Sequence, residues 1–288
     1  MSRQEVPVLF LKGHATGNDF VVLPDPDDQL HLSDNQVQRL CDRRFGVGAD
    51  GILRVVASKD MSVADWMVGD TEWFMDYRNA DGTIAEMCGN GARLFARYLL
   101  DADLVDADLV TGQPFQFGTR SGVRTGAEAG GRMMSVGMGQ AHLLELEPLV
   151  VSLAQQQWSA IGVSVPNPHA VAFVSDLAGL GQLDSYSVSP GSSFPEGVNV
   201  EFVEVLADDT IQMRVHERGV GETLSCGTGA CAAAYAHTRI HASEVASVTV
   251  KVPGGDLVVT EASDGDLTLT GPTEFVATGQ LDRDWLVA

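Results

Sequence analysis

The chain has 288 residues, of which 44% are hydrophobic and 20% are charged, as in a soluble globular protein of one large or two ordinary domains. Its net charge of −21 repels nucleic acid and anionic membrane surfaces, and no apolar run is long enough to span a membrane, so neither is expected as a partner. Four cysteines do not make a disulfide framework in a chain of this length, so we expect a cytoplasmic protein with reduced thiols.

Short runs rich in β-branched residues recur along the chain, bounded by Gly, Pro and Asp, and predict many strands. The predicted strands cover residues 6–11, 52–56, 73–77, 133–136, 170–174, 199–205, 211–215, 245–252, 257–260 and 267–269. The phrases "ADDT" at 207–210 and "SDGD" at 263–266 carry Asp and Gly where tight turns require them.

The first predicted helix lies in "SDNQVQRLCDRRFG". Ser33 is suited to be its N-cap, Val37, Leu40 and Cys41 recur at helical spacing, and Gly46 is expected to stop it. Two later stretches, rich in Ala and Leu, predict buried helices. The mixture of elements indicates an α+β fold.

A phrase that combines a cysteine with two glycines occurs twice, as "EMCGNGARLFARYL" around Cys88 and "LSCGTGACAAAY" around Cys226. A loop with an asparagine precedes each copy, at Asn18 and at Asn167. Because the order of asparagine loop, strands and cysteine-led helix occurs twice, the sequence predicts a duplicated domain. The Gly-rich stretch 126–132 is a candidate linker between the copies.

The first turn of a helix presents outward-pointing backbone N–H groups and the positive end of the helix dipole. A cysteine at this place is expected to have a lowered thiol pKa. Glycines beside it allow a ligand carboxylate to approach the N–H groups of the first turn. Each phrase therefore predicts an acid–base thiol next to a carboxylate cradle.

The other two cysteines, Cys41 and Cys231, are interpreted as small core residues. The sequence has no Cys-x-x-Cys pair, and we expect no metal site. The stretch "GVGADG" at 46–51 matches a dinucleotide-binding pattern, but a helix precedes it and a strand follows it. That pattern requires the reverse order, so a turn is the better interpretation.

Six phrases in order give the chain a close resemblance to the diaminopimelate epimerases, which are pyridoxal-independent amino-acid epimerases. The phrases are "KGHATGNDFVVL", "RRFGVGADGIL", "DYRNADGTIAEMCGNGARLFARYL", "VPNPHAV", "GVNVEFVEV" and "VHERGVGETLSCGTGACAAA". The resemblance implies two similar domains related by a pseudo-two-fold axis, each a β-barrel-like sheet around a central helix, with the site in the cleft between them. The implied domains are residues 1–131 with 272–288, and residues 132–271.

The resemblance also implies the reaction, which converts LL-diaminopimelate to the meso form on the route to lysine and peptidoglycan, without a cofactor. Cys88 and Cys226 match the two catalytic thiols, with Cys88 as the base for the LL isomer, and His169 and Glu217 match groups that tune them. The substrate-binding positions that match are Asn18, Asn79, Gly89, Asn90, Asn167, Asn199, Glu217, Arg218, Gly227 and Thr228. The family is usually a cytoplasmic homodimer.

One position departs from the family pattern, because Gly51 stands where some relatives carry Gln. Two other functions remain open at this stage. A proline or hydroxyproline racemase of the same fold also uses two cysteines, although a small cyclic substrate would leave the Asn, Glu and Arg set unpaired. A redox-sensing or non-catalytic thiol protein is the alternative outside enzymes.

Overall fold

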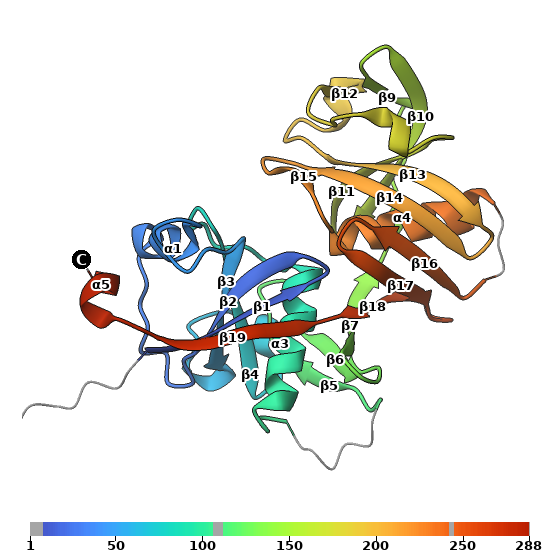
Figure 1. Cartoon of the computed structure of the whole chain (residues 1–288). Coiled ribbons are helices and arrows are strands. Elements are labelled where there is room, and N and C mark those ends of the chain that lie inside the picture. The colour runs from blue at the N-terminus through green and yellow to red at the C-terminus, as the bar shows by residue number, and fades with distance from the viewer. Residues whose placement is uncertain (1–7, 106–111, 242–244, 288) are drawn as a thin grey trace, which may run out of the picture. The chain divides into compact units, whose positions relative to one another are not determined.

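Residues 8–105, 112–241 and 245–287 are described by a computed structural model (Figure 1). The chain forms two compact units, the first from residues 1–134 with 273–288 and the second from residues 135–272. Each unit combines strands with a buried helix that begins at a cysteine. The α+β fold class predicted from the sequence is confirmed.

The main sheet of the first unit has the strand order β19-β1-β2-β3-β4, in which β2 and β3 are parallel and the other neighbours are antiparallel. Its strands are β1 (Val8–Ala15), β2 (Asn18–Pro24), β3 (Gly51–Ala57), β4 (Trp73–Asn79) and β19 (Glu274–Leu281). The strand β19 comes from the end of the chain and pairs with β1. Strands β5 (Phe115–Phe117) and β6 (Arg124–Glu128) lie outside this main sheet, pair with each other and form the end of a longer sheet.

Helix α3 (Gly89–Asp101) packs against β1, β2, β3, β4 and β6 of this unit (Figure 1). Its buried face includes Leu94, Phe95, Ala96 and Leu99. The short helices of the unit are α1 (Asp34–Cys41), η1 (Ser58–Asp60), α2 (Asp65–Val68) and α5 (Arg283–Val287). The sheet therefore wraps around α3, which carries one of the two cysteine phrases at its start.

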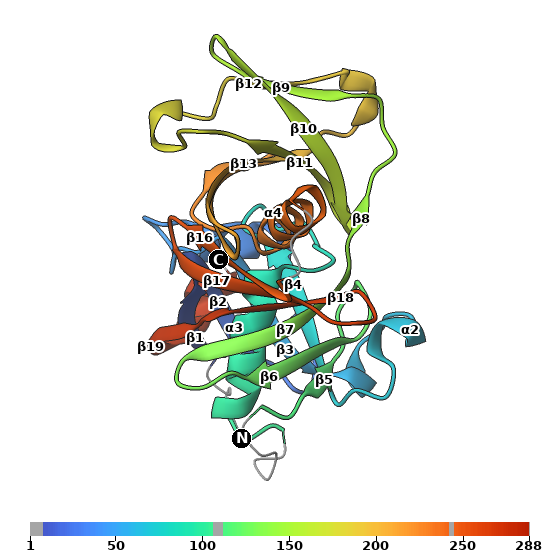
Figure 2. The same cartoon turned by 90° about the vertical axis from the view of Figure 1, so that its right-hand side faces the viewer.

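The second unit is built in the same way around α4 (Gly227–Ile240), which packs against β10, β11, β13, β14, β16, β17 and β18. In Figure 2, α4 lies between β11 and β13 on one side and β16 and β17 on the other. Its alanines from Ala230 to Ala236 are almost all fully buried. Small side chains on all faces let strands approach the helix from every direction, as a helix at the centre of a sheet requires.

The strands of the second unit have the order β12-β9-β10-β11-β13-β14-β16-β17-β18-β7, with β8 beside β10 and β15 beside β14. They are β7 (Met133–Gln140), β8 (His142–Leu143), β9 (Leu149–Leu153), β10 (Gln156–Val165), β11 (Asn167–Phe173), β12 (Tyr186–Ser189), β13 (Asn199–Ala207), β14 (Thr210–Glu217), β15 (Gly221–Thr223), β16 (Ser247–Val252), β17 (Gly255–Glu261) and β18 (Asp266–Pro272). Two short 3₁₀ helices, η2 (Ala178–Leu180) and η3 (Gly191–Ser193), follow β11 and β12.

The predicted start of α1 is confirmed. Ser33 accepts a hydrogen bond from the N–H of Gln36, whose side chain bonds back to the Ser33 N–H, so the two form a capping box. The predicted stop at Gly46 is wrong, because the helix ends at Cys41. Asp42 is extended and its carboxylate accepts the N–H groups of Arg44 and Phe45, which competes with continuation of the helix.

The predicted linker at 126–132 is also wrong. Residues 126–128 belong to β6, and the rest of the stretch forms a turn in which the Ala129 N–H donates to the Met133 carbonyl at 3.0 Å. The turn joins β6 to its neighbour β7. Gly130 and Gly131 have positive φ angles of 90° and 60°, so the glycines serve a tight hairpin instead of a flexible connection.

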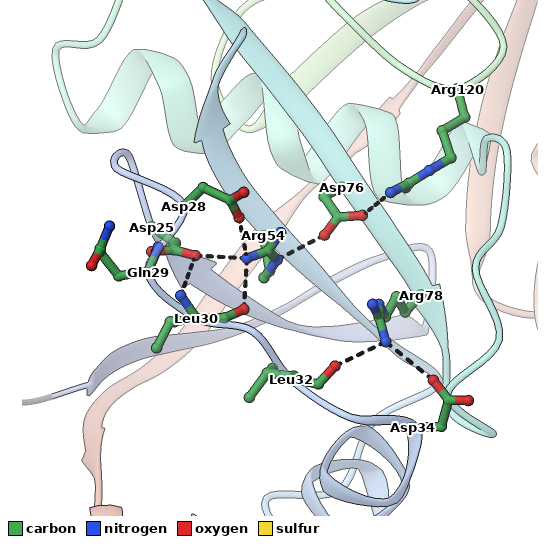
Figure 3. A network of polar contacts seen from close by, with 10 residues as sticks. All are labelled: Asp25, Asp28, Gln29, Leu30, Leu32, Asp34, Arg54, Asp76, Arg78 and Arg120. Carbon is green, nitrogen blue, oxygen red and sulfur yellow. Dashed lines mark hydrogen bonds and ion pairs between the residues drawn. The ribbon is translucent and has the colours of Figure 1, made fainter. Parts of the chain in front are cut away.

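A buried ionic network braces the main sheet of the first unit (Figure 3). On β3, Arg54 donates to Asp76 on β4 and to Asp25 after β2, in both cases at 2.7 Å, and also to Asp28 at 2.9 Å. The other oxygen of Asp76 pairs with Arg120 at 2.6 Å. Burial alone would raise the pKa of Asp76, but the guanidinium groups of Arg120 and Arg54 outweigh it and lower that pKa.

We expect the substitution Asp76→Asn to lower the free energy of unfolding by about 3 kcal/mol at pH 7, because Arg120 loses its carboxylate partner and Arg54 keeps only Asp25 and Asp28. A lowered folded-state pKa gives stability that is present above the unfolded value of about 4 and lost as the pH falls through the folded value. The deficit should therefore shrink below about pH 4. Urea titrations at pH 7 and at a pH below about 4 test this. The control is Asp101→Asn, which removes the exposed ion pair with Arg97 and should lower the free energy of unfolding by under ~1 kcal/mol.

Candidate active site

Both cysteine phrases adopt the same local structure, since Cys88 is the N-cap of α3 and Cys226 is the N-cap of α4. Both residues are extended, with φ and ψ of −140° and 121° at Cys88 and −119° and 117° at Cys226. Each sulfur accepts the N–H of the third residue of its helix, from Gly91 at 3.5 Å and from Gly229 at 3.4 Å. The duplicated phrase therefore forms a duplicated thiol-capped helix start.

In the first unit, Cys88 lies beside two of the predicted asparagines. Its Sγ donates to Asn18 Oδ1 at 3.6 Å, and Asn90 Nδ2 donates to the same oxygen at 3.3 Å. Asn18 is held in turn by Asp50, which accepts from its Nδ2 at 2.7 Å. The thiol, both amides and the first turn of α3 thus form one polar cluster, with Cys88 only partly buried.

A fully buried arginine on α3, which was not among the predicted site residues, supports this cluster. Arg93 donates to Asn90 Oδ1 at 2.8 Å, to Thr16 Oγ1 at 3.2 Å and to the Gly89 carbonyl at 3.4 Å. Arg93 thereby orients the Asn90 side chain so that the NH₂ group of Asn90 points toward Asn18. The signal in the sequence was a charged residue that falls on the buried face of the helix, beside Asn90.

The structure places Asn79 at the end of β4. Its Oδ1 accepts from the Tyr77 hydroxyl at 2.9 Å, and its Nδ2 donates to Thr83 Oγ1 at 3.0 Å. These contacts brace the turn that follows β4. Across the ladder, Asn79 pairs with Gly51, where a Cβ would lie 2.6 Å from the Arg78 carbonyl oxygen. A side chain such as Gln at position 51 would therefore require the backbone to shift.

In the second unit, Cys226 is 5% exposed and lies among acidic and hydroxyl groups. Its Sγ is 3.4 Å from Thr228 Oγ1, and the Glu217 carboxyl lies close enough for the carboxyl and the thiol to shift each other's pKa. Glu217 also accepts from the Thr223 hydroxyl at 2.5 Å. Glu217, at the end of β14, and Thr228, in the first turn of α4, thus both reach the thiol.

The lowered thiol pKa expected from a helix N-terminus is wrong for Cys226. Burial raises its pKa well above the ordinary value, and the carboxylates of Glu217 and Glu201 add to this. The Thr228 hydroxyl and the Gly229 N–H favour the thiolate but do not outweigh the loss of water. Burial also raises the pKa of Glu217. Cys226 is therefore held in its protonated form.

The ionisation of Cys226 can be followed directly by ¹³Cβ NMR of cysteine-labelled protein, with the signal assigned by Cys226→Ser. We expect a midpoint above the value of free cysteine, about 8.5. The thiol's contribution to stability should be present below that value and be lost as the pH rises through the folded midpoint. Glu217→Gln removes one neighbouring carboxylate and should lower the midpoint; an unchanged midpoint would contradict the electrostatic cause.

The predicted His169 is fully buried on β11, between two oxygen atoms. Its Nε2 is 3.0 Å from Asn167 Oδ1, and its Nδ1 is 2.7 Å from Glu201 Oε1. Glu201 is also fully buried, on β13, and was not among the predicted site residues. Both strand faces are buried there, so no alternation of polar and apolar residues marked this glutamate.

Asn199 and Arg218 form a further linked pair in the second unit. Asn199 Oδ1 accepts the backbone N–H of Arg218 at 2.9 Å, and the Arg218 guanidinium donates to the Glu196 carbonyl at 3.1 Å. The Arg218 stem packs on Gly197, where a Cβ would lie 2.9 Å from Arg218 Cδ. The exposed guanidinium remains able to receive an anion with its other N–H groups.

The remaining thiols are core residues, as predicted. Cys41 is 5% exposed in α1, where burial raises its pKa to about 11, and Cys231 is fully buried in α4. His237 and His241 have the His-x-x-x-His spacing of some metal-binding helices, but their rings pack against each other, with centroids 4.7 Å apart and planes tilted by 46°. In the part of the chain that the structure describes, no three His, Cys, Asp or Glu side chains gather as a metal site, and no helix is long and apolar enough to cross a membrane.

The chain shares its fold with solved structures that include epimerases, racemases and phenazine biosynthesis proteins. Over 96% of its length it matches a phenazine biosynthesis protein of the PhzF family from Bacillus anthracis, which is covered to 99%, with a TM-score of 0.68 and 14% identity. Over 98% it matches a hydroxyproline epimerase from Agrobacterium vitis, which is covered to 94%, with a TM-score of 0.63 and 15% identity. At these identities the likeness concerns the fold.

The sequence comparisons are more specific. The family model described as diaminopimelate epimerase matches residues 10–144 and 161–276. The diaminopimelate epimerase of Streptomyces coelicolor is 49% identical over 287 residues, with 97% of each chain covered. That of Mycobacterium tuberculosis is 45% identical over 292 residues, covering 96% of this chain and 98% of its own. The chain belongs to the diaminopimelate epimerase family, whose members are isomerases.

Proposed function

We propose that the chain interconverts LL- and meso-diaminopimelate by proton transfer between two cysteines, without pyridoxal phosphate or a metal ion. The observation that carries the mechanism is the repeated thiol-capped helix start at Cys88 and Cys226. One such thiol could be a structural cap, whereas two suit a reaction in which one group removes a proton and another returns one to the opposite face.

In the proposed LL direction, the Cys88 thiolate removes the α-proton and becomes a thiol. The Cys226 thiol gives its proton to the other face of the carbanion and becomes a thiolate, so the proton count is balanced. The raised pKa of Cys226 supports this assignment, because it keeps the proton on Cys226 until the carbanion forms. His169 and Glu217 are proposed to tune the thiols, and the electrostatic interaction between Glu217 and Cys226 supports that role.

The first turns of the two helices are proposed to hold the carboxylate at the reacting end of the substrate. Their N–H groups, at Gly89 and Asn90 and at Gly227 and Thr228, carry the positive end of the helix dipole. The residues proposed to bind the remaining ammonium and carboxylate groups are Asn18, Asn79, Asn167, Asn199, Glu217 and Arg218. Amide and guanidinium groups suit a substrate with two amino-acid ends, because each end must be paired once water is excluded.

The two epimerase domains are proposed to be residues 1–131 with 272–288 and residues 132–271, acting together on one substrate. We also propose that the enzyme works as a cytoplasmic homodimer that supplies meso-diaminopimelate to lysine and peptidoglycan synthesis. Size-exclusion chromatography with light scattering tests the dimer. A monomer at micromolar concentration would contradict that part of the proposal.

The reaction itself is tested by circular dichroism, which follows the change in optical activity as LL-diaminopimelate becomes the meso form. Proton exchange at the α-carbon in D₂O, read by NMR, gives a second readout. L-Proline and trans-4-hydroxy-L-proline should give no signal. Activity with either imino acid and none with diaminopimelate would instead favour the racemase alternative. Dialysis against a chelator should leave the rate unchanged.

A further inference from the structure

Glu201 is a buried acid whose second oxygen is not satisfied. Its Oε1 bonds to His169, while Oε2 is buried without a hydrogen-bond partner among the residues that the structure describes. Leaving a carboxylate oxygen unbonded away from water is costly. A glutamate that only filled space on β13 would be replaced at lower cost by an apolar residue, so its contacts point to a role in the site.

The first contact fixes the histidine ring. His169 Nδ1 lies 2.7 Å from Glu201 Oε1, so the ring carries its proton on Nδ1 and donates it to the carboxylate. Nε2 lies 3.0 Å from Asn167 Oδ1. With its proton on Nδ1 the ring accepts at Nε2, so a hydrogen bond there requires the Asn167 amide to turn its NH₂ group toward the ring. Asn167 is a proposed substrate ligand, so the contacts run from a buried carboxylate through the imidazole to a residue proposed to hold the substrate.

The second contact is with the start of α4. A Cβ placed on Gly229 would lie 2.6 Å from Glu201 Oε1 and 3.4 Å from Cys226 Sγ. The carboxylate thus lies directly beside the first turn of α4, close to the thiol. This explains why the second glycine of "CGTG" has no side chain, since the carboxylate occupies the space that a methyl group would need.

We propose that Glu201 is a positioning residue, which holds the His169 ring through Nδ1 and acts on the reaction only through His169 and Cys226. This inference rests on the proposed epimerase function. The titratable groups that face Glu201 are His169 on β11, Glu217 on β14, Cys226 at the start of α4 and Tyr186 on β12. It lies under these groups, inside the protein, and does not bind substrate itself.

The test compares Glu201→Ala, which removes the acceptor, with Glu201→Gln, which keeps an acceptor oxygen without the charge. Glu204→Gln is the matched control, because Glu204 lies on the same strand but accepts from the Leu177 N–H. We expect Glu201→Ala to lower kcat by about 10- to 100-fold, as loss of a group that orients a histidine does, with KM changed by less than ~3-fold. Glu201→Gln should recover most of the loss, and Glu204→Gln should match the parent.

The ring itself is read by ¹⁵N–¹H NMR of the imidazoles, with His169 assigned by His169→Gln. The parent and Glu201→Gln should show His169 protonated on Nδ1 in a strong hydrogen bond, and Glu201→Ala should lose that signal. An unchanged ring signal or an unchanged kcat in Glu201→Ala would overturn the proposal. If Glu201→Ala does not fold, the spectrum of Glu201→Gln tests the proposal instead. Loss of the His169 Nδ1 signal in Glu201→Gln would also overturn the proposal.

These spectra do not depend on activity. If the parent protein failed to epimerise diaminopimelate, the proposed function would fall while the ring signal still decided whether Glu201 holds His169. If the parent is active and Glu201→Ala keeps the parent's kcat, the positioning role fails and the function stands.

Discussion

Replacing either Cys88 or Cys226 by alanine is expected to lower the rate of diaminopimelate epimerisation by about 1,000-fold or more, with the fold retained. Each thiol serves one face of the substrate in the proposed mechanism, so neither can replace the other, and loss of a positioned acid or base costs about 10²- to 10⁴-fold. The measurement is the circular dichroism assay in both directions, together with thermal unfolding of each variant.

The chain supplies its own controls in Cys41 and Cys231, which are buried in α1 and α4. Cys41→Ala and Cys231→Ala each remove one sulfur from a packed core and should lose about 1 kcal/mol of stability while they keep the parent rate. A parental rate in Cys88→Ala or Cys226→Ala would mean that the two-thiol mechanism is wrong. Equal losses in all four variants would indicate a loss of folding instead.

The second large effect is expected at Gly229, where alanine should lower kcat/KM by about 10-fold or more and stability by about 1–3 kcal/mol. Alanine favours a helix by about 1 kcal/mol relative to glycine, so propensity alone predicts the opposite sign. We expect the steric clash to outweigh the helix propensity, because the new methyl would lie 2.6 Å from Glu201 Oε1, and that oxygen is held by His169.

The matched control is Gly91→Ala at the corresponding position of α3. There the nearest atom to a new methyl is Leu53 Cδ2 at 3.2 Å, the end of an apolar side chain that can move by a few tenths of an ångström. We expect a smaller loss than at Gly229. The double variant Gly229→Ala with Glu201→Ala should relieve the clash, so the two stability losses should not add. Additive losses would argue against contact between the methyl and the carboxylate.

Local features of the chain were predictable because they depend on neighbouring residues. The capping box at Ser33, the tight turns at 207–210 and 263–266, and the two helices that begin at cysteines all follow from short sequence patterns. The family could also be assigned from six ordered phrases. These patterns carry the same information wherever the segment lies in the protein.

Other local predictions failed where a contact in the folded structure outweighed the local sequence pattern. Gly46 does not stop α1; a Cβ there would lie 2.0 Å from the Arg39 carbonyl oxygen, so the glycine allows the chain to fold back on the helix. Strand β19 was not predicted from the residue pattern, because Val276, Ala277 and Thr278 are all exposed and show no alternation; only the family resemblance implied that the end of the chain belongs to the first domain. It exists because β1, far away in sequence, offers it a partner.

The sequence by itself determined that two thiols cap two helices, and with it the class of chemistry. Only the tertiary structure decided that one of those thiols, Cys226, keeps its proton and stays neutral. The helix dipole at Cys226 is local and favours the thiolate, but burial and the carboxylates of Glu217 and Glu201 come from the packing of β13 and β14 against α4. Their combined effect is larger, because removing a charge from water costs more than a helix end returns.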